Sequence, residues 1–214
     1  ERLRMIRKIL LASVLIIASQ FAFAQQAEAE KFQEGVHYFK IAQVPAASDN
    51  DEIQVTVVFS YLCSHCNTLD PYVESWAKRQ PDNIKLNRIH VDFGGASSMM
   101  ARGYIASEMT GIADQSHPAM MDAIWKQRKR FRSPEQLADF YADFGVEQDR
   151  YLANYNSFAL DSQMRRNMQN VQTYGVTGTP AIVVAQKYRV PNTSVIMDVV
   201  DYLIAIETTA QPAP

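Results

Sequence analysis

The sequence predicts an α/β fold in which a sheet is interrupted by a run of helices. The apolar run Val55–Phe59 is typical of a buried strand and leads directly into Cys63-Ser64-His65-Cys66. A second strand is followed by roughly seventy residues with helical periodicity. The chain then returns to a strand at Ala181–Val184, directly after a proline, which is expected at a strand's first residue.

The first part of the chain is predicted to supply most of the sheet. Short apolar or alternating runs predict strands at Tyr38–Ile41, Ile53–Phe59 and Ile84–Val91. Between the last two, apolar residues at helical spacing predict a helix from Cys63 to about Arg79, which Pro71 is expected to kink. The first cysteine therefore falls at the start of a helix.

The middle of the chain is predicted to be helical. Ser133-Pro134-Glu135-Gln136 has the pattern of a capping box with proline at the first helical position. Helices are expected to begin there and to span Met99–Met109, His117–Lys129, Glu147–Ser157 and Asp161–Tyr174.

The two cysteines, the only ones in 214 residues, carry the chemistry. Unpaired backbone N–H groups and the helix dipole at a helix start favour a thiolate, so the motif predicts a redox-reactive pair. A structural zinc site wants four ligands, and beyond the motif the chain offers only the scattered His37, His90 and His117. A structural disulfide would close a very short loop, and two inert buried thiols fit poorly with the polar residues between them. Redox chemistry is therefore preferred, with no metal and no cofactor expected.

Residues 1–24 have the pattern of a secretory signal peptide. A short basic region follows Met5, an apolar stretch of about ten residues comes next, and Ala22-Phe23-Ala24 provides the small-x-small cleavage pattern. An uncleaved anchor is the alternative, but a membrane span needs about twenty apolar residues. We expect cleavage after Ala24 and a start at Met5 rather than at the first residue.

Charge argues against nucleic acid as a partner. Loss of residues 1–24 removes four of the 21 basic and one of the 23 acidic residues, which leaves a formal charge of about −5. The basic cluster Lys126–Arg130 is the local exception, and it is expected to be the solvated end of a helix.

Taken together, these features resemble the DsbA-type periplasmic thiol:disulfide oxidoreductases. The resemblance covers nearly all of the expected mature chain, with Gly175-Val176-Thr177-Gly178-Thr179-Pro180 before the last strand as its second marker. It implies a thioredoxin-like fold with an inserted helical domain. Residues 25–95 and 163–214 would form the thioredoxin-like domain, and residues 96–162 the insertion.

The resemblance also implies roles for particular residues. Cys63 would exchange disulfides with clients and Cys66 would be its buried partner, while Ser64 and His65 would tune the redox equilibrium. In the family, the residue matching Pro180 is cis and lies beside the active-site disulfide. Its predecessor, here Thr179, exposes backbone for pairing with substrate.

Two departures from the family pattern concern the surroundings of the cysteines. Ser64 stands where the family commonly has proline, and Val57 stands where many members have a buried acid, which removes a candidate proton relay. Arg88 matches a lysine near that acid, and it could lie below the cysteines or be an exposed surface cation.

The predicted function is oxidation of reduced secreted client proteins in the periplasm by a monomer, with a DsbB-type membrane enzyme as reoxidant. The alternatives are a disulfide reductase or isomerase and a non-catalytic peptide or metal binder. Isomerases that resemble this fold carry an added dimerisation domain, for which the expected mature chain is too short.

Overall fold

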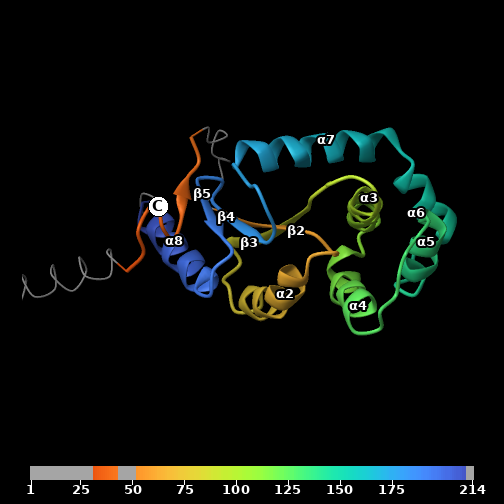
Figure 1. Ribbon diagram of the computed structural model, residues 1–214, viewed down its shortest axis with the longest axis horizontal. Helices are drawn as coiled ribbons and strands as arrows, with labels where there is room; N and C mark the ends of the chain where they lie inside the picture. The colour runs from red at the N-terminus through yellow and green to blue at the C-terminus, as the bar shows by residue number, and fades with distance from the viewer. Residues whose placement is uncertain (1–30, 43–51, 211–214) are drawn as a thin grey trace, which may run out of the picture.

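The computed structural model of this chain describes residues 31–42 and 52–210 (Figure 1). The predicted signal peptide, residues 1–24, lies outside the described residues. No helix within those two ranges is long and apolar enough to cross a membrane.

A five-stranded mixed sheet, in the order β1-β5-β4-β2-β3, forms the base of the fold (Figure 1). The strand β2 (Ile53–Phe59) pairs parallel with β3 (Ile84–His90) and antiparallel with β4 (Ala181–Val184). The sheet is completed by β5 (Tyr188–Pro191) and the short β1 (Phe39–Lys40). β2 is an inner strand, paired along both edges, and its residues form a nearly continuous apolar run that is almost entirely buried.

Helices cover both faces of the sheet. Alternate β2 residues such as Val57 and Phe59 belong to the larger apolar core, together with buried residues of α2 (Ser64–Ala77) and α8 (Ile196–Ala210). On the opposite face, Val58 packs with residues of β3 and β4 and with the end of α7 (Phe158–Thr173). This layering fixes the end of β2 between the two helical layers.

The helical segment lies to one side of the sheet (Figure 1). It consists of α3 (Ala96–Met109), α4 (Ala113–Trp125), α5 (Pro134–Ala142) and α6 (Gln148–Tyr155), and α7 leads back to the sheet. The proposed domain boundary between residues 162 and 163 falls inside the continuous helix α7, so the division into domains stays a prediction.

The helices α3 and α7 each begin three residues before their predicted starts, and α4 differs most from its predicted span. The helix α4 begins four residues before His117 and ends at Trp125, so the basic cluster Lys126–Arg130 is not the end of a helix. The cluster has no apolar residue to extend the buried face of α4, and Arg128 adopts a positive φ of 60°. The cluster is exposed, as predicted, but in a loop.

The predicted helix start at Ser133 is confirmed. The Gln136 N–H donates to Ser133 Oγ at 3.4 Å, and Pro134 is the first helical residue. The side chain of Gln136 accepts from the N–H of Arg132 at 2.8 Å, one residue before the cap, so only half of the capping box forms in its usual way.

Candidate active site

Cys63 lies where the chain turns from β2 into α2. It is the N-cap residue of α2, with extended backbone angles, and its side chain makes no capping hydrogen bond. The motif residues Ser64 and His65 form the first turn of the helix and are exposed. Cys63 is half-buried, whereas Cys66 is 3% exposed and belongs to the core, so only the first sulfur is open to a large partner.

The loop before β4 lies against the first cysteine. The antiparallel pairing of Val58 with Ala181 brings the start of β4 to the end of β2. The peptide bond between Thr179 and Pro180 is cis, and the Cys63 thiol donates to the Thr179 carbonyl oxygen at 3.4 Å. The expected cis bond and the expected place of this loop beside the first cysteine are thereby confirmed.

The two thiols differ in acidity. Burial acts to raise the pKa of Cys63, but hydrogen bonds from the Thr179 hydroxyl, from the Cys66 N–H and thiol, and from the His65 N–H outweigh it, so this pKa is lowered. Burial raises the pKa of Cys66 to about 12, although a hydrogen bond with the Ser60 backbone acts to lower it. His65 acts on Cys63 through its backbone, as expected for a helix start.

A buried histidine holds the turn that leads into the cysteines. His90, at the end of β3, accepts from the Tyr61 N–H through Nε2 at 3.0 Å, and its Nδ1 lies 2.8 Å from the Val91 carbonyl oxygen. Burial lowers the pKa of His90 to about 4, so the ring is neutral, with its proton on Nδ1. Trp125 donates to the Tyr61 carbonyl oxygen at 2.9 Å and ties the same turn to α4.

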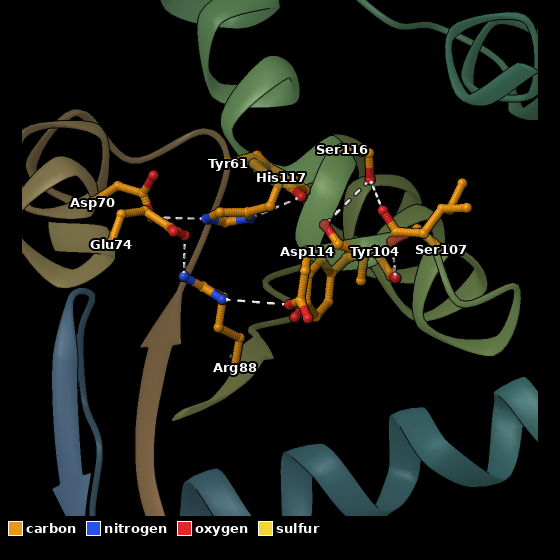
Figure 2. Close-up of polar contacts among 11 residues, drawn as sticks. Tyr61, Asp70, Glu74, Arg88, Tyr104, Ser107, Asp114, Ser116 and His117 are labelled. Atoms are coloured by element: carbon orange, nitrogen blue, oxygen red, sulfur yellow. Dashed lines mark hydrogen bonds and ion pairs between the residues drawn. The ribbon is translucent and has the colours of Figure 1, made fainter. Parts of the chain in front are cut away.

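A network of charged side chains lies below the turn (Figure 2). Arg88, whose side chain is 6% exposed, contacts Glu74 directly and lies 3.9 Å from Asp114. His117 Nε2 lies 2.8 Å from Asp70 Oδ1, and His117 Nδ1 lies 3.0 Å from the Tyr61 hydroxyl. The network joins α2 and β3 to α4, and Arg88 is therefore buried rather than a surface cation.

Four of these residues, Asp70, Glu74, Asp114 and His117, were not predicted from the sequence to lie near the cysteines. Asp70 and Glu74 follow Cys66 by four and eight residues, so helical spacing alone could have placed them on one face of α2. His117 has no such signal, because its position depends on how α4 packs against α2.

The network also bears on metal binding. Asp70, Glu74 and His117 each bring a ligand atom within 4.8 Å of the others. Arg88 already contacts Glu74, and the His117 ring already bonds to Asp70, so we treat the three as members of an ion-pair network.

Comparisons with known proteins agree with this geometry. The family described as "DSBA-like thioredoxin domain" matches residues 54–204. The thiol:disulfide interchange protein DsbA of Azotobacter vinelandii is 33% identical over 214 residues, covering 96% of this chain and 100% of that protein. The corresponding protein of Pseudomonas aeruginosa is 32% identical over 209 residues, covering 95% of this chain and 98% of that protein.

A solved structure shows the same similarity. The crystal structure of Pseudomonas aeruginosa DsbA superimposes with a TM-score of 0.78 at 32% identity, covering 85% of this chain and 97% of that one. With its Cys-x-x-Cys pair, the chain is a thiol:disulfide oxidoreductase, and it belongs to the DsbA-like thioredoxin family.

Proposed function

We propose that the protein is an oxidase, which donates a Cys63–Cys66 disulfide to client proteins. The supporting observation is the opposite shift of the two thiol pKa values, lowered for Cys63 and raised to about 12 for Cys66. A stabilised Cys63 thiolate favours the reduced form of the enzyme, and a disulfide whose reduced form is stabilised is a strong oxidant.

The reaction follows from the exposure of the two sulfurs. A client thiolate attacks Cys63 Sγ, the Cys63–Cys66 bond breaks, and its electron pair goes to Cys66, which then takes a proton. A second client thiolate attacks the client sulfur of the mixed disulfide. Cys63 leaves as a thiolate, the client gains a disulfide, and the enzyme holds the two electrons.

A groove beside the cysteines is suited to an extended client segment. It has a volume of about 530 Å³, and it runs from the start of α2 to the segment before α8. His65, Leu69 and Tyr72 line one side, and Val195 and Met197 line the other. Tyr72 is 65% exposed, so it offers an apolar ring to a client, while Thr179 offers backbone next to Cys63.

The setting of this activity is the periplasm in our proposal. The pattern of residues 1–24 directs export, and a DsbB-type membrane enzyme would accept the electrons, as the resemblance implies. We propose that the exported protein acts as a monomer on reduced secreted proteins. Expression of the whole chain in a Gram-negative host should yield periplasmic protein whose first residue is Gln25. Retention of the first 24 residues would contradict this.

The reduction potential of the Cys63–Cys66 pair tests the direction of exchange. We expect a value well above that of thioredoxin, which is about −270 mV, together with rapid oxidation of a reduced client and slow reduction of insulin. A potential near the thioredoxin value with rapid insulin reduction would favour a reductase. Two thiols that remain free in the presence of oxidised glutathione would favour a non-catalytic binder.

A further inference from the structure

When the disulfide opens, the Cys66 sulfur must take up a proton. Its sulfur is buried, and burial raises the pKa of this thiol to about 12, so a bare thiolate is a poor leaving group. Val57, which lies on β2 below the cysteines, has no proton to give. Another group must therefore supply the Cys66 proton.

A small cavity lies between Cys66 and the charged network. Its polar lining comes from Cys66, Asp70 and Arg88, and the rest comes from apolar groups, which include Val57 and Pro180. Its volume is about 10 Å³, close to the least space that holds one water molecule. Such a water needs two to four polar partners, and Cys66, Asp70 and Arg88 are the polar residues that line the space.

Asp70 connects this cavity to solvent. It follows Cys66 by four residues on α2, so the two side chains lie on one face of the helix. Asp70 also lines a second, open groove of about 740 Å³ between α2 and α4. It is the titratable residue that borders both spaces, since the other residue shared by their linings is Met121.

The surroundings hold Asp70 in this position. His117 Nε2 lies 2.8 Å from Asp70 Oδ1, and the other ring nitrogen lies 3.0 Å from the Tyr61 hydroxyl. Arg88 on β3 contacts Glu74 on α2 and lies 3.9 Å from Asp114 on α4. The open groove adds charged residues of α2 and α4, namely Lys78, Arg79, Asp122 and Lys126.

We propose that Asp70, oriented by His117, exchanges the Cys66 proton with solvent through one water in this cavity. When a thiolate opens the disulfide at Cys63, the Cys66 sulfur receives the electron pair of the broken bond and a proton from the water, which Asp70 replenishes from the groove. When the disulfide closes, the Cys66 proton leaves by the same path. The proposal rests on thiol exchange at the cysteine pair, but not on its direction.

The closing step can be measured alone. The whole chain, in its exported form, is prepared with glutathione attached to Cys63, and the release of glutathione by Cys66 is followed by quenched flow between about pH 4 and pH 9. Asp70→Asn should slow release near neutral pH by on the order of 10²-fold, the usual size of acid–base assistance, and make the rate rise with pH across the whole range. The alkylation rate of Cys63 in the reduced protein should stay unchanged.

Two further variants separate proton transfer from a structural role. Asp122→Asn removes a carboxylate that lines the open groove but not the cavity, and it should leave the release profile as in the wild type. Val57→Asp places a carboxylate on another wall of the cavity, so adding it to Asp70→Asn should restore a large part of the rate. If Asn at position 70 prevents folding, Asp70→Ser gives the same comparison.

The outcomes are distinct. Equal release profiles for the wild type and the Asp70 variant, or an equal loss in Asp122→Asn, would overturn the proposal. Restoration by Val57→Asp would support it, and failure of that rescue would assign Asp70 a structural role. A wild type that never releases glutathione would instead overturn thiol exchange at this pair, whatever the Asp70 variant does.

Discussion

The sulfur of Cys63 lies 3.4 Å from the carbonyl oxygen of Thr179, although the two residues are 116 positions apart. The contact depends on the antiparallel register of β2 and β4, which sets Val58 opposite Ala181. A slip of one residue would turn the side chains of β4 to the other face of the sheet. The redox site is therefore positioned by the sheet as well as by α2.

The order of the two cysteines predicts which variant traps clients. Cys66→Ser should accumulate mixed disulfides, because only the buried second sulfur can release Cys63 within the molecule. Cys63→Ser should abolish oxidase activity and trap little, because Cys66 is 3% exposed. Non-reducing gels of both variants with reduced clients measure this. Greater trapping by Cys63→Ser would reverse the assignment.

The two thiols predict how stability depends on redox state and pH. The reduced protein should be more stable than the oxidised one near neutral pH, since the favoured Cys63 thiolate exists only when the disulfide is open. The folded pKa of Cys63 is lowered, so its contribution is full above the unfolded value of about 8.5 and fades as pH falls through the folded value. The folded pKa of Cys66 is raised to about 12, so its contribution is full below about 8.5 and fades as pH rises toward 12.

The advantage of the reduced form should therefore be largest near pH 8 and smaller on both sides. Denaturant unfolding of both redox forms between about pH 4 and pH 10 gives the difference. An oxidised form that is more stable over the whole range would contradict the strong-oxidant proposal.

His90 predicts a separate loss of stability in acid. Its folded pKa is lowered to about 4 from 6.5, so its contribution is full above pH 6.5 and is lost as pH falls through about 4. The largest possible loss is of order 3 kcal/mol, at about 1.4 kcal/mol for each pKa unit. His90→Gln, measured by denaturant unfolding of the oxidised form, should reduce the loss in that window. His37→Gln, at a half-buried histidine, should not, and an equal effect of both would refute the assignment to His90.

Much of the fold could be predicted because its signals are local. The strands β2 and β4 have their predicted bounds, since a nearly continuous apolar run marks a strand that is covered on both faces. The prediction did not identify β5 or α8. The strand Tyr188–Pro191 is short and contains an arginine, so its pattern is weak, and its place in the sheet comes from pairing with β4.

The candidate site likewise contains some residues that a local motif predicts and others whose position depends on packing. The cysteines and Thr179-Pro180 were recognised from motifs. Their closeness in space was predicted from the family resemblance and not from their spacing in the sequence. The charged network was not predicted, because Arg88, Asp70 and His117 come from three elements and meet only through packing. Burial of Arg88 could not be read from β3, because the strand also contains the polar residues Lys85 and Asn87.

Removal of one partner of the Arg88–Glu74 ion pair is expected to destabilise the fold strongly. Arg88→Met leaves Glu74, whose side chain is 27% exposed, without its partner, so we expect a loss on the order of 2 to 4 kcal/mol in the free energy of unfolding. Adding Glu74→Met should recover part of the loss, because two apolar side chains can replace a buried ion pair. Lys40→Met, which breaks a pair with Glu34 that is roughly half exposed, should cost much less, because solvent screens an exposed ion pair.

Denaturant unfolding of the four proteins of the Arg88 and Glu74 cycle measures the coupling between the two side chains. The comparison is made on the oxidised form, so that changes in thiol ionisation do not enter. We expect a coupling of at least about 1 kcal/mol, since Glu74→Met leaves the buried Arg88 without its nearest carboxylate and Arg88→Met leaves the part-buried Glu74 without its partner. Additive losses would mean that Arg88 stabilises the fold through its contact with Asp114 or through the packing of its stem, and the ion pair with Glu74 would then not hold α2 against β3.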